Sequence, residues 1–302
     1  MSINFGIIGA AGYVAPKHMR AIKETGNRIV AAMDPNDSVG IIDSYFPEAL
    51  FFTEIERFDR HVHKASRGAG KIDYLSVCSP NYLHDAHIRL GLRNGCDVIC
   101  EKPLVINPDN IQYLLELEEE TGKKVNTILQ LRYHERIIDL KNLYKSSSKK
   151  SIVDLRYITS RGNWYRQSWK AQPGKSGGLA ANIGIHFFDM LTWIFGNPIE
   201  SEVINMDERT IEGVLTLDRA VVRWTLSTDP KNLPGEVISS GGRAYRSLSI
   251  DGNEVDFSTG FTDLHTVTYR NILNGNGFGL KDAIMPLRIC RDILKGPGVT
   301  LY

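Results

Sequence analysis

The first 125 residues of the chain alternate short apolar runs with amphipathic stretches. The apolar runs are Ile3–Gly9, Arg28–Asp34, Tyr74–Ser79, Asp97–Pro103 and Lys124–Gln130. Between them, segments such as Tyr82–Asn94 and Asn110–Thr121 carry apolar residues every three or four positions, which is typical of helices. Strands that alternate with helices pair in parallel, because each helix carries the chain back across the sheet. This part of the chain is therefore predicted to form a parallel sheet with helices on both faces.

The pattern changes after residue 125. Ser151–Ser160 alternates apolar and polar residues, and Gly213–Leu226 is predicted to form two strands around a tight turn at Asp218-Arg219. Tyr245–Ser258 contains Asp251-Gly252, a two-residue hairpin signal. Because consecutive hairpins build antiparallel sheets, we predict an α/β domain over residues 1–125 and an α+β domain over residues 126–302.

Composition excludes several classes of protein. The chain has 36 basic and 35 acidic side chains, a net charge of +1, so neither nucleic acid nor a membrane surface is an expected partner. No apolar run is expected to approach the roughly 20 residues of a membrane-spanning helix. The four cysteines include no C-x-x-C pair, which favours reduced thiols in a cytoplasmic protein. They are Cys78, Cys96, Cys100 and Cys290.

A glycine-rich turn follows the first apolar run. Gly9, Gly12 and Ala15 give the spacing G-x-x-G-x-x-A, one residue longer than the usual dinucleotide fingerprint. Such glycines allow a tight turn and let the backbone approach a pyrophosphate; an ordinary tight turn is the alternative. Asp34 lies 22 residues after Gly12, at the end of the second run, where a carboxylate binds an adenosine ribose. Since its charge would repel a 2′-phosphate, NAD is predicted rather than NADP.

Polar groups follow two further apolar runs. Ser79-Pro80-Asn81 and Glu101-Lys102-Pro103 stand where ligands bind in open parallel sheets, outside the carboxyl ends of strands. A proline beside each polar group restricts the backbone and can form a cis peptide; the alternative is a pair of capped turns with a solvated lysine. The predicted cofactor contacts are Gly9, Ala11, Gly12, Tyr13, Val14, Asp34, Asn36, Ser79, Asn81, His84, Glu101, Lys102 and Gln130.

Gly177–Gly196 is a largely apolar stretch that carries three polar side chains. If it is helical, Asn182, His186 and Asp189 share one face, and either a buried network or a ligand must satisfy them. A structural histidine is the alternative reading of His186. The preceding loop, residues 161–175, mixes cations with aromatic rings that suit carboxylates, phosphates and flat rings; a basic surface loop is its alternative. The predicted substrate contacts are Asn182, Arg161, Tyr165 and Lys170.

Together the glycine turn, the E-K-P sequence and the pattern GG…N-x-G-x-H-x-x-D resemble the Gfo/Idh/MocA oxidoreductases, NAD(P)-dependent sugar and inositol dehydrogenases. The resemblance covers essentially the whole chain. It implies a Rossmann domain, then an α+β domain with a large open antiparallel sheet that often forms dimers or tetramers. It also implies that Lys102 and His186 are the catalytic residues. Asn182 stands where many members carry aspartate, which disfavours the inositol and glucose branches.

Six stretches resemble one subgroup of that family, the UDP-N-acetylglucosaminuronate 3-dehydrogenases. They are GAAGYVAPKHM, SPNYLH, CDVICEKPLV, RGNWYRQSWK, NIGIHFFDMLTWIFG and GFTDLHTVTYRNIL. This resemblance implies oxidation of the C3 hydroxyl of UDP-2-acetamido-2-deoxy-D-glucuronate with NAD, in the synthesis of diacetamido uronic acids for bacterial surface polysaccharides such as the lipopolysaccharide O-antigen. Some relatives keep the cofactor bound and recycle it with 2-oxoglutarate.

Oxidation of an alcohol requires a base and a positive group beside its oxygen while hydride leaves carbon. His186 is the expected base, and Lys102 is expected to position the hydroxyl and stabilise the alkoxide, although the residues alone leave these roles interchangeable. The alternatives are a dehydrogenase of a free sugar or inositol and a non-catalytic NAD-sensing regulator. No metal site is expected, because His61-x-His63 and His84-x-x-His87 lack further ligands at useful spacing. A homo-oligomer is expected, because an open sheet face needs cover.

Overall fold

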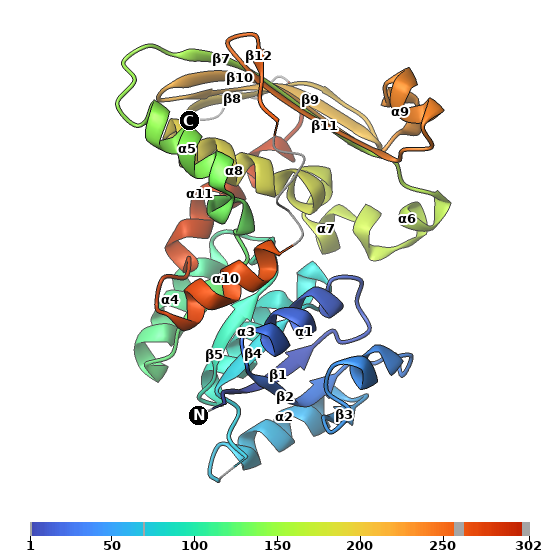
Figure 1. Ribbon diagram of the computed structural model, residues 1–302, viewed down its shortest axis with the longest axis vertical. Helices are drawn as coiled ribbons and strands as arrows, with labels where there is room; N and C mark the ends of the chain where they lie inside the picture. The colour runs from blue at the N-terminus through green and yellow to red at the C-terminus, as the bar shows by residue number, and fades with distance from the viewer. Residues whose placement is uncertain (1, 69, 257–262, 298–302) are drawn as a thin grey trace. The chain divides into compact units, whose positions relative to one another are not determined.

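The computed structural model describes residues 2–68, 70–256 and 263–297, and the chain divides into two compact units (Figure 1). The first unit comprises residues 1–105, 109–130 and 263–283, and the second comprises residues 106–108, 131–262 and 284–302. The predicted boundary after residue 125 lies close to the main crossing point. Residues 263–283, however, return to the first unit, whereas the sequence prediction placed them in the second domain.

A parallel six-stranded sheet forms the centre of the first unit, with strand order β3-β2-β1-β4-β5-β6. The strands are β1 (Asn4–Ile8), β2 (Arg28–Met33), β3 (Leu50–Phe52), β4 (Tyr74–Val77), β5 (Asp97–Cys100) and β6 (Val125–Thr127). The strand order reverses beside β1, which is where such sheets bind ligands. The five predicted strands are confirmed. β3 was not predicted, since three half-exposed residues leave almost no periodic signal.

The helices of the first unit are α1 (Ala15–Glu24), α2 (Ile55–Ala65), α3 (His84–Arg93), α4 (Asn110–Thr121) and α10 (Leu264–Leu273), with 3-10 turns η1 (Gly40–Ser44) and η2 (Asn81–Leu83). Gly122 ends α4 with a left-handed φ of 67°, which confirms the predicted helix boundary. The core joins Phe5 of β1 and Met19 of α1 to Tyr269 and Ile272 of α10. This burial explains why α10 belongs to the first unit.

The second unit contains a six-stranded sheet with the order β12-β11-β7-β10-β9-β8. The strands are β7 (Ser151–Thr159), β8 (Pro198–Met206), β9 (Thr210–Leu217), β10 (Ala220–Ser227), β11 (Ala244–Ile250) and β12 (Asn253–Glu254). Both predicted hairpins are present, and Asp251 and Gly252 adopt the positive φ values, 50° and 80°, that a type I′ turn requires. The predicted antiparallel sheet is mixed, because β7 and β10 are parallel neighbours that β8 and β9 separate in sequence. All other pairings are antiparallel.

The second unit also holds helices α5 (Glu135–Tyr144), α6 (Asn163–Gln167), α7 (Pro173–Ser176), α8 (Ile185–Phe195) and α9 (Gly235–Ser239), and the short turns η4 (Trp169–Ala171) and η6 (Pro230–Asn232). Most of α11 (Leu280–Ile293) and of η3 (Gln130–Tyr133) also lies in it. Figure 1 shows α5 and α8 on one face of the sheet. Phe188 of α8 meets Trp224 of β10 edge to face at 5.3 Å. On the alternate positions of the strands, which face the other way, Ile152, Ile204 and Arg223 are exposed.

The segment Pro173–Phe195 is long and apolar enough to cross a membrane by length and composition. This differs from the expectation that no such run exists, because that expectation counted only uninterrupted apolar residues. Its most apolar window has a mean hydropathy of 1.2, and 72% of that window is buried inside the structure. Burial of this kind is typical of a core helix.

Candidate functional site

The glycine turn is held tightly between neighbouring strands of the first unit. Gly9 has a φ of 87°, and a Cβ atom there would lie 2.6 Å from the backbone of Cys78 and Ser79. The N–H of Gly9 donates to the carbonyl of Met33 at 2.8 Å. A Cβ atom on Gly12 would approach the carbonyl oxygen of Gly9 at 3.0 Å. Close backbone approach and the positive φ therefore require glycine at Gly9, and a side chain at Gly12 would be tightly crowded, as the dinucleotide interpretation predicts.

Helix α1 begins immediately after this turn. Val14 is its N-cap, no side chain caps it, and no acidic residue lies in its first turn. The N–H groups of Ala15 and Lys17 donate to the carbonyls of Gly12 and Val14, and Pro16 has none, so what the helix start offers a phosphate is the positive end of its dipole. Ala11 and Gly12 lie within the turn, and Tyr13 is 93% exposed beside it. The turn fits a pyrophosphate.

Asp34 directly follows β2 and contacts the glycine turn. Its Oδ2 accepts a hydrogen bond from the N–H of Ala11 at 2.9 Å, and its Oδ1 accepts one from Asn36 at 2.9 Å. The sequence placed Asp34 at a ribose but did not show that it also braces the turn. Each carboxylate oxygen retains acceptor capacity for a ribose hydroxyl.

We expect Asp34→Ala to weaken NAD binding by about ten- to a hundredfold, since hydrogen bonds to a charged group contribute about 1.5–3 kcal/mol. Titration of the protein with NADH and NADPH, followed by cofactor fluorescence, measures this. Asp37→Ala is the matched control, because Asp37 is an exposed acid in the same loop. Unchanged NAD affinity in Asp34→Ala would contradict the assignment of the ribose site.

The end of β4 carries Ser79 and Asn81, and both are buried. Ser79 Oγ lies 2.8 Å from Nδ1 of His87. His84 is fully buried, with Nε2 2.8 Å from the carbonyl of Ser79 and Nδ1 2.7 Å from the carbonyl of Pro103. Burial lowers the pKa of His84. The ring therefore ties together the ends of β4 and β5, and its predicted contact with the cofactor stays a prediction.

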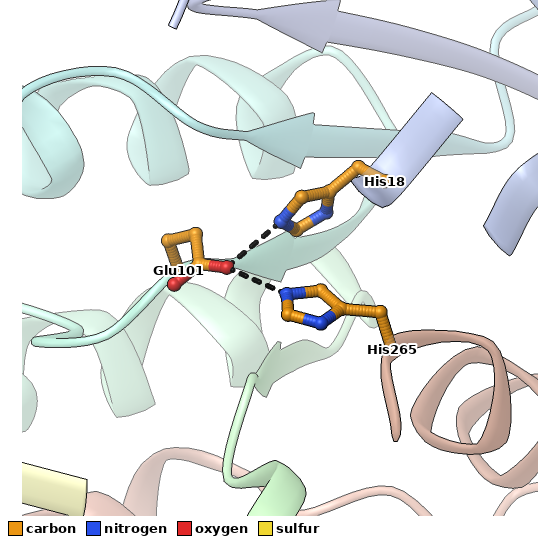
Figure 2. A group of neighbouring side chains, drawn as sticks. All are labelled: His18, Glu101 and His265. Carbon is orange, nitrogen blue, oxygen red and sulfur yellow. Dashed lines mark hydrogen bonds and ion pairs between the residues drawn. The ribbon is translucent and has the colours of Figure 1, made fainter. Parts of the chain in front are cut away.

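Glu101 and Lys102 follow β5. The Glu101 carboxylate is buried between the imidazole rings of His18 and His265, with Nε2–Oε1 distances of 2.9 and 3.1 Å (Figure 2). Burial raises the pKa of Glu101, but the hydrogen bonds from the two rings outweigh it and hold that pKa well below its usual value. The Lys102-Pro103 peptide is cis.

Gln130 is the last predicted cofactor contact of the first unit. Its Oε1 is buried and has no hydrogen-bond partner among the residues that the structure describes. An unsatisfied buried acceptor fits a site that a ligand completes.

In the second unit, the predicted helix is interrupted. Residues Ala180–Gly184 form a π-helical segment, η5, that leads into α8. Asn182 lies in this segment, and its Nδ2 donates to the hydroxyl of Tyr165 at 2.6 Å. Burial raises the pKa of Tyr165. The structure thus brings together two of the predicted substrate contacts, and His186 lies half-buried one residue into α8. Segments of π-helix are frequent at functional sites.

Asp189 has a structural partner. Arg132 of η3 donates to both of its carboxylate oxygens, at 2.7–3.1 Å, and the two side chains are 6% and 1% exposed. The predicted polar line along the helix is therefore divided between a structural ion pair and the Asn182–Tyr165 pair. Arg132 had no recognisable pattern in the sequence.

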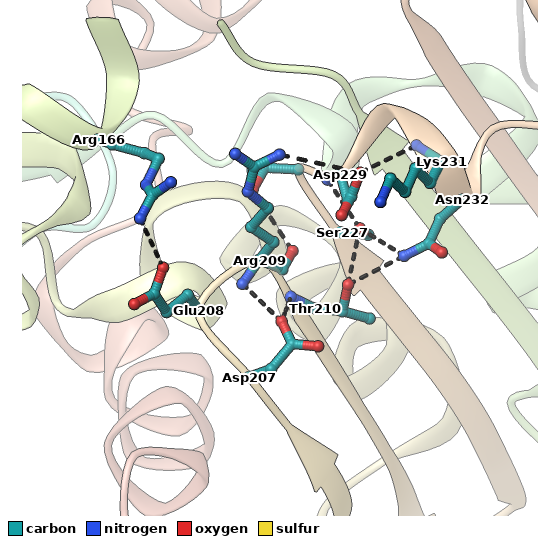
Figure 3. Close-up of polar contacts among 10 residues, drawn as sticks. Arg166, Asp207, Glu208, Arg209, Thr210, Ser227, Asp229, Lys231 and Asn232 are labelled. Atoms are coloured by element: carbon teal, nitrogen blue, oxygen red, sulfur yellow. Dashed lines mark hydrogen bonds and ion pairs between the residues drawn. The ribbon is translucent and has the colours of Figure 1, made fainter. Parts of the chain in front are cut away.

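The predicted substrate loop, residues 161–175, forms an ion pair at the surface. Arg166 of α6 donates to Glu208 at 2.9 Å in a surface ion pair, close to a network that includes Arg209, Asp229 and Asn232 (Figure 3). Such exposed pairs contribute little stability, about 0–1 kcal/mol. Lys170 lies 4.0 Å from the centre of the Trp169 ring. Arg161 is exposed, and its backbone N–H donates to Thr228.

Comparison with known proteins agrees with both units. Residues 3–128 match the Gfo/Idh/MocA oxidoreductase family, NAD-binding Rossmann fold, and residues 151–272 match its C-terminal alpha/beta domain. The WlbA (WbpB) dehydrogenase from Thermus thermophilus, solved with NAD and UDP-GlcNAcA, is 46% identical, with a TM-score of 0.93 over 98% of this chain and 96% of that chain. Its structure with NAD and alpha-ketoglutarate is 47% identical, with a TM-score of 0.93 over 97% and 94%.

Curated relatives match over a shorter range. D-glucoside 3-dehydrogenase from Escherichia coli (strain K12) is 29% identical over 45% of this chain and 39% of that protein, so the chain spans less than half of it. The two family matches nevertheless cover most of the chain and coincide with the Rossmann turn and the mixed sheet described above. The chain belongs to the Gfo/Idh/MocA family of oxidoreductases, and its first unit is an NAD-binding Rossmann domain.

Proposed function

We propose that this protein oxidises the C3 hydroxyl of UDP-2-acetamido-2-deoxy-D-glucuronate (UDP-GlcNAcA) to a ketone, with NAD as the hydride acceptor. The observation that carries the proposal is the 46% identity, over 98% of the chain, to a WlbA dehydrogenase solved with NAD and UDP-GlcNAcA. The Asn182–Tyr165 pair supports it, because two polar groups held together in a half-buried setting suit a substrate that presents several hydroxyl and amide groups.

The chain's own residues divide the chemistry between them. NAD supplies the acceptor for the hydride of C3 when it is bound. His186 is assigned the removal of the C3 hydroxyl proton, and the Lys102 ammonium is assigned the positioning of that oxygen and the stabilisation of its developing charge. Asn182 and Tyr165 are assigned sugar contacts, and Arg161 and Lys170 the acidic groups of the substrate.

We also propose the setting of this activity. The four cysteines of the chain are buried thiols outside any disulfide, which favours a reducing compartment and hence the cytoplasm. A relative at 47% identity was solved with alpha-ketoglutarate, which supports recycling of bound NADH by 2-oxoglutarate. A role in diacetamido uronic acid synthesis for surface polysaccharides follows from the proposed substrate. The open sheet face, with Ile152 and Ile204 exposed, supports a homo-oligomer, which sedimentation velocity tests.

The experiment that tests the function is turnover of the purified protein with defined substrates. We expect NAD-dependent formation of a 3-keto sugar from UDP-GlcNAcA, identified by mass spectrometry, and continued turnover when 2-oxoglutarate is added. UDP-N-acetylglucosamine, glucose and myo-inositol are the comparison substrates. Faster oxidation of a free sugar or inositol would favour the alternative dehydrogenase, and NAD binding without turnover of any sugar would favour a sensor.

A further inference from the structure

Three side chains from distant parts of the sequence meet at Glu101, the residue that precedes Lys102. His18 comes from α1, Glu101 from the end of β5, and His265 from α10 (Figure 2). All three are buried, and the two rings meet edge to face, with their centroids 5.2 Å apart. The stretches that carry the family resemblance contain all three residues but do not indicate that they lie together.

The hydrogen-bond pattern determines where the protons lie. Because the low pKa of Glu101 keeps it ionised, it can only accept, and both Nε2 atoms must donate to it. Nδ1 of His18 then accepts from the Tyr269 hydroxyl at 2.7 Å, and that hydroxyl accepts from Ser76 at 2.8 Å. Burial lowers the pKa of His18, in agreement with a neutral ring. The hydrogen bonds of His18 are thus complete with a neutral ring.

The other carboxylate oxygen of Glu101 reaches the backbone of the next residue. Oε2 accepts a hydrogen bond from the Lys102 N–H at 3.2 Å. One carboxylate therefore contacts α1, α10 and the peptide that carries the Lys102 side chain. A buried carboxylate held from three sides has little freedom to move, so the peptide bound to it is restrained as well.

We propose that His18 and His265 are positioning residues for Lys102, which act through the carboxylate of Glu101. The proposal rests on the function proposed above, in which Lys102 contacts the reacting oxygen. It also links Lys102 to the glycine turn, because His18 lies in the first turn of α1, the helix that begins three residues after Gly12. One nitrogen or oxygen atom from each of the three side chains lies within 4.8 Å of the others, as in a set of metal ligands, but the hydrogen bonds to Glu101 account for both of the Nε2 atoms.

A pair of variants at His265 tests the donor itself. His265→Gln keeps an N–H donor near the Nε2 position, whereas His265→Leu removes it. We expect His265→Leu to lower kcat for UDP-GlcNAcA about tenfold, with KM and NAD affinity nearly unchanged, and His265→Gln to stay within about threefold of the wild type. Glu101→Ala is less informative, because it leaves two buried rings unpaired and risks unfolding.

Thr266→Val is the matched control. Thr266 Oγ1 donates to Glu24 at 2.7 Å, so this variant removes a hydrogen bond between the same two helices without touching Glu101. We expect its kcat to equal that of the wild type. Equal losses in Thr266→Val and His265→Leu would mean that general packing of α10 is responsible and would overturn the proposal, as would equal losses in the Gln and Leu variants.

A readout independent of the substrate separates this inference from the proposed function. Acetylation of the Lys102 amine by acetic anhydride, followed by mass spectrometry, provides this readout. It should be at least about threefold faster in His265→Leu than in His265→Gln or Thr266→Val. The reason is that a less firmly held Glu101 no longer restrains the Lys102 backbone, so the side-chain amine moves more freely. No difference would overturn the proposal even if the wild type is fully active. If the wild type does not oxidise UDP-GlcNAcA, the function fails while this measurement still decides the positioning role. Stoichiometric metal that is lost in His265→Leu would replace the proposal with a metal site.

Discussion

Replacing Lys102 or His186 by alanine is expected to lower kcat for UDP-GlcNAcA by a factor of about 10² to 10⁴, with NAD binding retained. Each side chain is assigned a charge or a proton at the reacting oxygen, and removal of either leaves the hydride transfer unassisted. Because groups that act as a unit are not additive, we expect the double variant to be little worse than the more damaging single one. Stopped-flow measurement of NADH formation, with NAD affinity measured separately, checks both parts.

Exposed residues of the same types provide the controls. Lys64 and His63 both lie on α2, and the variants Lys64→Ala and His63→Ala should keep wild-type turnover. Lys102→Arg keeps the positive charge and separates electrostatic stabilisation from proton transfer, since arginine does not release its proton. Near-normal activity in His186→Ala would show that this histidine is structural, like the Asp189–Arg132 pair one turn further along α8.

Arg161→Leu is expected to reduce kcat/KM for UDP-GlcNAcA by about ten- to a hundredfold and to change that for UDP-N-acetylglucosamine much less. The reason is that a guanidinium–carboxylate contact is charge-assisted, contributes about 1.5–3 kcal/mol, and has no counterpart in the uncharged sugar. The ratio of kcat/KM for the two sugars, measured in wild type and variant, isolates the carboxylate from all other contacts.

Arg166→Leu is the control from the same loop. Arg166 is already paired with Glu208 in an exposed ion pair, so its loss should leave the ratio within about twofold of the wild type. If Arg166→Leu changes the ratio and Arg161→Leu does not, the carboxylate contact is wrongly assigned. If the wild type oxidises both sugars equally, the loop does not recognise the acid at all, and the family and cofactor assignments are unaffected.

Local patterns were sufficient for much of the first unit. The glycine turn, the strand that ends at Asp34 and the helix that ends at Gly122 were all predictable, because each depends on neighbouring residues and on backbone conformations that few residues adopt. The sequence also predicted both hairpins of the second unit, since a two-residue turn determines how its strands pair.

Contacts between distant residues were not predictable in this way. The parallel pairing of β7 with β10 joins strands that β8 and β9 separate in sequence, so no turn between them indicates it. The π-helical segment before α8 has no local signal in the sequence. Arg132 and Asp189 are separated by 57 residues, and nothing near either one names its partner.

The sequence by itself predicted five of the six strands of the first unit, the glycine turn, and Lys102 and His186 as the catalytic candidates, because short-range spacing and motif encode them. Only the tertiary structure decided which side chains surround these residues. His18 and His265 lie 83 and 164 residues from Glu101, yet all three share one buried hydrogen-bond network. The physical reason is that a buried carboxylate must find donors wherever the packed chain supplies them, and packing joins elements without regard to their distance in sequence.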